Sequence, residues 1–175
     1  MKNIPTTTAS LTIALVVTVM TSNQSTAQTT AQPAVQQASA GTLDNSPAQL
    51  AKAFLTAVQQ GDHTVPKALL HPNVKWHQPG KHRFAGLKVS SAAVFQMVGA
   101  MSEASTKTLR LAEVKSITVH GNQVACLINW KAVMEGGGGV LDVDNIDVYT
   151  IQDGKIVEAR IFSADLAQED NFWGW

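Results

Sequence analysis

The sequence predicts an α+β fold in which N-terminal helices are followed by a curved antiparallel sheet. Apolar residues recur at helical spacing in several segments before residue 104. From residue 107 to 162, β-rich segments follow one another and are joined only by short turns. Helices first and a strand meander last are typical of a sheet covered by helices on one face. Such an arrangement tends to leave a pocket between the sheet and the helices.

The first helix is predicted to begin at Ser46, because Pro47 and Gln49 complete a pattern typical of helix starts. It is predicted to end at Gly61. Its apolar stripe consists of Leu50, Phe54, Ala57 and Val58. A second helix is expected at 65–70, a short strand at 74–77 that ends before Pro79-Gly80, and a third helix at 91–104.

Four strands are predicted after the third helix. Asp153-Gly154 lies between the last two, and Asp-Gly between β-rich segments is the strongest short-range signal of a hairpin. Gly121-Asn122 and the glycine run 136–139 make the other two turns. The predicted strands are 107–120, 122–135, 140–151 and 156–162.

The composition excludes several classes of partner. The chain has 175 residues, which suggests one domain with additional segments. Its 13 basic and 13 acidic residues give a formal net charge of zero, whereas nucleic-acid binding needs a positive face. The same balance argues against docking on anionic membranes. Cys126 is the only cysteine, and its place in an alternating strand favours a small buried side chain over a nucleophile.

The N-terminal segment resembles an export signal. Lys2 precedes the apolar run 11–20, which is too short to span a bilayer as a helix. Small residues at 25–27 offer a cleavage site and those at 38–40 a second one, whereas the alternative interpretation is a buried helix or strand.

This interpretation divides the chain into three parts. We expect a signal peptide at 1–27, a Thr/Gln/Ala-rich linker without regular structure at 28–45 and one domain at 46–175. The mature protein would be exported, to the periplasm or out of the cell, with no membrane contact beyond the signal peptide.

Asp147 is the leading candidate catalytic residue. Strand alternation places it on one face with Leu141, Val143, Tyr149 and Ile151. An apolar site would raise the pKa of its carboxyl, which suits a proton shuttle or a neutral hydrogen-bond donor. The alternative is a structural aspartate tied to Arg160 or to a backbone amide.

His77 is the second catalytic candidate, because a histidine titrates near neutral pH and could act as a base paired with Asp147. Alternation, however, puts Trp76 and Gln78 on one face of the strand and His77 on the other unless the chain bulges. The alternative is a hydrogen-bonded wall residue or one that faces outward.

Several further residues are candidates for binding a substrate, although plain core packing is the alternative for each aromatic one. Trp173 and Trp175 follow the last strand, where they could close the pocket mouth or lie in a dimer interface. The candidate substrate-binding residues are Phe54, Trp76, Gln78, Phe84, Trp130, Tyr149 and Trp173.

No metal or other cofactor is predicted. The run 142–147 superficially resembles a calcium loop, but its sixth position, which requires glycine, is Asp147. His71, His77 and His82 match no usual zinc spacing. The glycine run 136–139 lacks the Lys-Ser/Thr and the following helix of a phosphate-binding loop.

Several motifs together resemble the nuclear transport factor 2-like (cystatin-like α+β) superfamily, and within it the SnoaL-like relatives of polyketide cyclases and ketosteroid isomerase. The resemblance covers about 47–173. It implies a cone-shaped fold with an internal pocket, and a homodimer. The motifs are Gln60-Gly61-Asp62, the stretch 74–80, Gly86 before a helix, the run 146–149 and the hairpin 153–158.

The resemblance also argues against two activities. Ketosteroid isomerase needs an aspartate base, a tyrosine and a protonated aspartate. An ungapped alignment puts Phe54 at the tyrosine and Gln78 at the base, and keeps only Asp147. Limonene epoxide hydrolase needs an Arg-x-Asp pair, which none of the arginines forms. Polyketide cyclases of this fold are said to use one pocket aspartate, a role that Asp147 fits.

The sequence therefore predicts an exported protein that binds a small apolar molecule. If it is an enzyme, the resemblance implies cofactor-free isomerisation, cyclisation or dehydration with Asp147 and His77 as the catalytic residues. The alternatives are a non-catalytic binding module and a dimerisation domain of the same fold.

Overall fold

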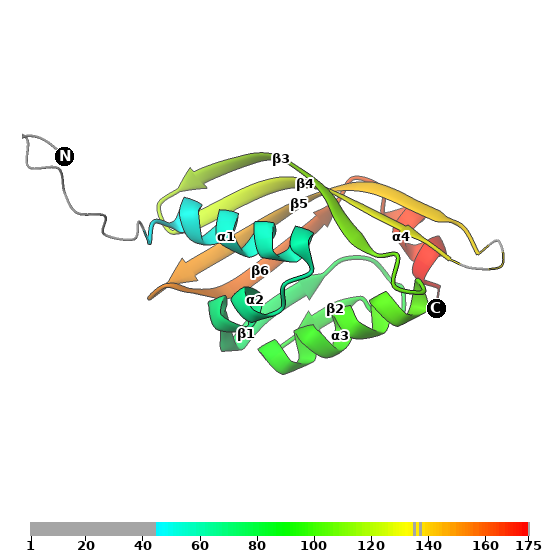
Figure 1. The fold of residues 1–175 in the computed structure, drawn as a ribbon, viewed down its shortest axis with the longest axis horizontal. Coiled ribbons are helices and arrows are strands. Elements are labelled where there is room, and N and C mark those ends of the chain that lie inside the picture. The colour runs from blue at the N-terminus through cyan, green and yellow to red at the C-terminus, as the bar shows by residue number, and fades with distance from the viewer. Residues whose placement is uncertain (1–44, 135, 137, 175) are drawn as a thin grey trace, which may run out of the picture. The chain divides into compact units, whose positions relative to one another are not determined.

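The computed structural model describes residues 45–134, 136 and 138–174, so the predicted signal peptide at 1–27 and residues 28–44 of the linker lie outside the described part. Within it, helices and strands follow the predicted order (Figure 1). The helices are α1 (Pro47–Gln60), α2 (Thr64–Leu69), α3 (Ser91–Ala104) and α4 (Leu166–Trp173). The strands are β1 (Leu70–Gln78), β2 (Gly86–Lys88), β3 (Arg110–His120), β4 (Gln123–Val133), β5 (Val140–Gln152) and β6 (Lys155–Ser163).

The six strands form one mixed sheet in the order β2-β1-β6-β5-β4-β3. The meander from β3 to β6 is antiparallel, as predicted. The pairing of β1 with β6 is parallel and places Trp76 beside Ala159, so the sheet is not antiparallel throughout. Most of the domain lies between these two strands in sequence, and so long a connection permits a parallel pair, whereas a short hairpin does not.

The helices and the core lie on one face of the sheet. Helix α1 contacts β3 and β4, α3 contacts β1, and α4 contacts β5 (Figure 1). Every second residue of β5 is buried on that face, from Leu141 to Ile151, which confirms the predicted alternation. None of the helices in this described region is long and apolar enough to cross a membrane.

Two short elements were not predicted from the sequence, β2 and α4. Helix α4 begins after Asp165, whose carboxylate accepts a hydrogen bond from the backbone N–H of Gln168 (2.8 Å). This is a standard N-cap, so the signal was present in the sequence. Helix α4 is important because it carries Glu169 and Trp173 into the core, where both are buried.

The loop between β1 and β2 is fastened to α4 by Asp170. One carboxylate oxygen, Oδ1, accepts hydrogen bonds from the backbone N–H groups of Lys81 (2.7 Å) and His82 (3.0 Å). The N–H of Arg83 donates to the carbonyl of Gly174 (2.9 Å). Gly80 starts the loop at φ +89°, and a Cβ there would lie 2.4 Å from Asp170 Oδ1. This contact therefore couples the loop conformation to the position of α4.

Replacing Gly80 by alanine should break this contact. We expect Gly80→Ala to lower the free energy of unfolding by about 1–3 kcal/mol more than Gly86→Ala, because two hydrogen bonds to a charged group are lost. Gly86 is a matched control, since its φ is +96° and a Cβ there would meet nothing within 4 Å. Urea denaturation measures both. Equal losses would show that backbone strain alone, and not the contact with Asp170, matters at Gly80.

Candidate functional site

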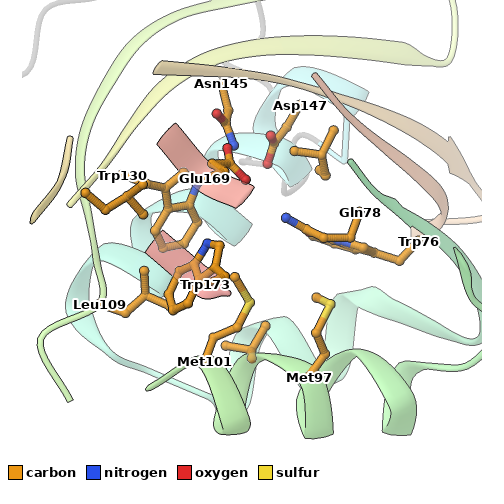
Figure 2. Close-up of a pocket in the computed structure, with 13 residues that line it drawn as sticks. Trp76, Gln78, Met97, Met101, Leu109, Trp130, Asn145, Asp147, Glu169 and Trp173 are labelled. Atoms are coloured by element: carbon orange, nitrogen blue, oxygen red, sulfur yellow. The ribbon is translucent and has the colours of Figure 1, made fainter. Parts of the chain in front are cut away.

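A pocket lies between the sheet, α3 and α4 (Figure 2). The hollow measures about 500 Å³, including the open space at its mouth. Two methionines of α3 form part of its wall, and flexible thioether side chains of this kind can rearrange around a ligand. The apolar lining consists of Trp76, Met97, Val98, Met101, Leu109, Trp130, Leu141, Ile161 and Trp173.

The polar side chains of the pocket come from three elements: Gln78 from β1, Asn145 and Asp147 from β5, and Glu169 from α4. Figure 2 shows Asn145, Asp147 and Glu169 gathered at one end, while Trp130, Trp173 and Met101 lie toward the other. Asp147 and Glu169 are each only 2% exposed. Carboxyls are almost never buried so completely without a charged partner, so this end of the pocket is the candidate site.

The two oxygens of Asp147 have different surroundings. Oδ2 accepts a hydrogen bond from the hydroxyl of Tyr149 (2.8 Å), whereas Oδ1 is buried and has no partner in the described part of the chain. Burial raises the pKa of Asp147 to about 7; the negative charge of Glu169 adds to the shift and the hydrogen bond from Tyr149 opposes it. The expected alternative partner, Arg160, instead binds Glu158 (2.7 Å).

Glu169 is the residue that the sequence analysis missed. Burial raises the pKa of its carboxyl, the nearby Ser163 and Asn145 side chains oppose the shift, and the charges of Asp170 and Asp165 reinforce it. Its Oε1 has no hydrogen-bond partner among the residues that the structure describes. Two carboxyls with raised pKa values in one apolar pocket can hold or transfer a proton near neutral pH.

His77 lies outside this pocket. Its Nε2 lies at hydrogen-bond distance from Glu158 Oε1 (2.9 Å), and its side chain remains one-third exposed. The register of β1 against β6 is regular from Lys75 to His77, so alternation turns His77 away from Trp76. The expected pairing of His77 with Asp147 is therefore not formed, for the reason that the alternation itself indicated.

The predicted binding residues divide into two groups. Trp76, Gln78, Trp130 and Trp173 line the pocket together with Asp147. The others pack behind the wall: Phe54 meets Tyr149 edge-on with ring centroids 5.5 Å apart, and Phe84 meets Trp173 at 5.6 Å. Phe54, Phe84 and Tyr149 therefore support lining residues or Asp147. Of the two C-terminal tryptophans, Trp173 lies inside the pocket, and Trp175 lies outside the described residues.

In the described part of the chain, no three His, Cys, Asp or Glu side chains are arranged to hold a metal ion. Residues of the candidate metal motifs have other partners. Asp142 and Asp144 bind Lys131 (2.8 Å) and Lys115 (2.6 Å). His71 accepts a hydrogen bond from the backbone N–H of Asn73 (3.1 Å).

Comparisons with known proteins identify the family and the fold. The SnoaL-like domain family matches residues 51–159. A protein of unknown function with a cystatin-like fold from Xanthomonas campestris is 39% identical, with a TM-score of 0.69; the match covers 74% of this chain and 98% of that one. No protein of curated function matches the sequence.

Two more distant crystal structures share the fold. One is a putative SnoaL-like polyketide cyclase from Mesorhizobium loti, which is 21% identical over 66% of this chain and 97% of that one, with a TM-score of 0.55. The other is TerC co-crystallised with polyporic acid, which is 19% identical over 74% of this chain and all of that one, with a TM-score of 0.63.

The raised pKa of Asp147 has a consequence for stability. Its carboxyl holds a proton more tightly in the folded than in the unfolded chain, where the pKa is about 3.9. The stabilisation from this group is therefore present below about pH 4 and is lost as pH rises through about 7. Glu169 acts in the same direction, and His82, whose pKa is lowered mainly by burial, acts in the opposite one.

Asp147→Asn should remove this pH dependence while keeping the shape of the side chain. We expect the free energy of unfolding of the variant, minus that of the wild type, to rise by a few kcal/mol between pH 5 and pH 8. The expected size follows because one unit of pKa shift corresponds to about 1.4 kcal/mol. Urea denaturation at a series of pH values measures the difference between the two proteins. A difference independent of pH would mean that Asp147 has an ordinary pKa.

Proposed function

The chain belongs to the SnoaL-like domain family, and we propose that it binds a small, largely apolar molecule and catalyses a cofactor-free acid–base reaction on it. The reaction would be an isomerisation, a cyclisation or a dehydration, with Asp147 as the proton donor. One observation carries the proposal: the Asp147 carboxyl is buried in the pocket wall, and its Oδ1 has no partner among the described residues.

The proposed role of Asp147 follows from its surroundings. Burial favours the neutral carboxyl, and the hydroxyl of Tyr149 engages Oδ2. The free Oδ1 is then available to donate a proton or a hydrogen bond to a substrate oxygen, which stabilises negative charge as it develops there. Three tryptophans in the wall suit the flat face of a ring. The polyketide cyclase and the TerC complex among the relatives support a small-molecule site of this kind.

A non-catalytic binding module is the second candidate. It is favoured by Phe54 and Gln78, which take the places that ketosteroid isomerase gives to its tyrosine and its base. Phe54 is buried against Tyr149, and Gln78 lines the pocket as an amide that cannot accept a proton at neutral pH. Steroid isomerisation by that mechanism is therefore not proposed.

We further propose that the protein is exported, with a signal peptide at 1–27, and forms a homodimer. The outer face of the sheet supports dimerisation, because Ile146 and Phe162 are cross-strand neighbours there and remain 45% and 55% exposed. Contact with a second copy of the chain would remove this apolar pair from water.

Native mass spectrometry of the protein expressed with its own N-terminus tests both statements. We expect a chain mass that corresponds to cleavage near Ala27, and a complex of twice that mass. An uncleaved chain would contradict export through this signal, and a monomer at micromolar concentration would contradict the dimer.

Ligand binding is tested by closing the pocket. Val98 lines the pocket but is 37% exposed, so Val98→Trp should narrow the pocket without disturbing the core. Native mass spectrometry should detect a co-purifying small molecule with the wild type and none with Val98→Trp. Val119→Trp, at a site 43% exposed and outside the pocket lining, is the matched control and should retain the molecule.

Two results would count against the proposal. Retention of the molecule by Val98→Trp would place its binding elsewhere on the protein. Once the molecule is identified, an Asp147→Asn variant that binds and converts it at the wild-type rate would exclude Asp147 as the proton donor.

A further inference from the structure

Unpartnered polar atoms gather at one place in the core. Four buried side-chain nitrogen or oxygen atoms of the described residues lack a hydrogen-bond partner: His82 Nε2, Asn145 Oδ1, Asp147 Oδ1 and Glu169 Oε1. An unpartnered buried polar atom is destabilising, and folded proteins leave few of them. Three belong to residues of the pocket wall, and the fourth faces Glu169. Their concentration indicates a site whose missing partners are supplied by a ligand.

Glu169 stands between the pocket and His82. Its Oε2 lies 3.9 Å from His82 Nε2, and both side chains are almost fully buried. His82 Nδ1 accepts a hydrogen bond from the backbone N–H of Phe84 (3.2 Å), so the proton of a neutral imidazole is on Nε2, the nitrogen nearest the carboxyl. A movement of less than about 1 Å would bring these atoms to hydrogen-bond distance.

The loop that carries His82 is itself held by α4. Asp170, the residue after Glu169, accepts hydrogen bonds from the backbone N–H groups of Lys81 and His82. Glu169 and His82 are therefore positioned by the same contact between loop and helix. Catalytic hydrogen bonds that are long in an empty site often shorten when a ligand binds.

We propose that Glu169 is the general base of this pocket and that Asp147 is the acid. In this proposal His82 positions the carboxylate of Glu169. The inference rests on the proposed function and deepens it by naming a second catalytic residue. A base of this kind would accept a proton from a carbon atom next to a carbonyl group, while Asp147 supplies a proton to the carbonyl oxygen. The two steps together yield an enol without any net change of charge or oxidation state.

The surroundings divide the two roles. Burial raises the pKa of Asp147 and the charge of Glu169 adds to the shift, which favours an ionised Glu169 beside a protonated Asp147. Glu169 is faced by Asp165 and Asp170 of its own helix, by His82 of the loop after β1, and by Asp147 of β5. The neutral side chains of Asn145 and Ser163 oppose the shift in its pKa.

A probe reaction tests the base without knowledge of the natural substrate. A carboxylate converts 5-nitrobenzisoxazole by removing the proton from its C3 carbon. The C–H electron pair forms the third bond of a nitrile while the N–O bond breaks, so the product is a coloured nitrophenolate and the carboxyl returns its proton to water. The flat apolar probe suits a pocket walled by tryptophans.

We expect Glu169→Gln to lower kcat for this probe at least 100-fold, the usual minimum contribution of a general base. Asp147→Asn should keep the activity within about tenfold and leave the midpoint of the pH–rate profile near its wild-type value, because the carboxyl that it replaces is neutral while Glu169 ionises. Glu158→Gln makes the same chemical change on the outer face, beside His77 and Arg160, and should leave kcat unchanged.

The role of His82 has its own test. We expect His82→Ala to lower kcat with little change in KM and to shift the pH midpoint, and His82→Gln, which retains a donor, to restore part of the rate. If kcat and thermal stability fall together while the pH midpoint stays unchanged, His82 has only a structural role. If Glu169→Gln does not fold, Glu169→Asp replaces it and should lower kcat at similar KM; an unchanged kcat would overturn the inference.

The outcomes separate the inference from the proposed function. Tryptophan fluorescence shows whether the probe binds, since three of the four tryptophans line the pocket. Binding with full activity in Glu169→Gln, and loss of activity in Asp147→Asn, would make Asp147 the base and overturn only this inference. Binding without turnover in the wild type would also overturn it while leaving the binding function in place. Absence of binding would contradict a pocket that accepts flat apolar rings, which is the premise of the proposed function.

Discussion

The burial of the Asp147 carboxyl is the constraint on which the rest of the site depends. An isolated carboxylate cannot be buried cheaply, so the surroundings either supply a partner or keep the group neutral. Among the described residues, Tyr149 alone gives this carboxyl a side-chain hydrogen bond, and the Tyr149 ring packs against Phe54 and Trp76. Cys126 is its neighbour on β4, and burial together with Asp147 raises the pKa of the thiol to about 12. The thiol therefore stays neutral, and the carboxyl is the reactive group.

Helix α4 makes the pocket a site for two carboxyls. It carries Glu169 and Trp173 to the pocket wall, and Asp170 ties it to the loop that contains His82. One helix thereby supplies a second ionisable group, an aromatic wall and the support for a buried histidine. Because like charges in a low-dielectric site repel each other strongly, the two carboxyls are not expected to ionise at the same pH.

Much of this arrangement could be predicted from the sequence, because local patterns determine it. The alternation of β5 correctly placed Asp147 among buried side chains, and the helical spacing of 91–104 matches α3. The same alternation indicated that His77 would face away from Trp76, and the structure pairs it with Glu158. The parallel pairing of β1 with β6 could not be predicted in this way, since it joins strands far apart in the sequence. Glu169 was missed because α4 was not recognised, although its N-cap residue Asp165 was visible in the sequence. The position of Glu169 near Asp147 could not be predicted, because it depends on tertiary packing alone.

The most direct test of the coupled carboxyls is a carbon-13 NMR titration of the side-chain carboxyl of Asp147, in the wild type and in Glu169→Gln. The structure predicts a midpoint near pH 7 in the wild type and a lower midpoint in the variant, because the charge of Glu169 contributes to the shift. A wild-type midpoint near pH 4, or one that does not move when Glu169 is replaced, would contradict a pocket in which these two groups share the control of one proton.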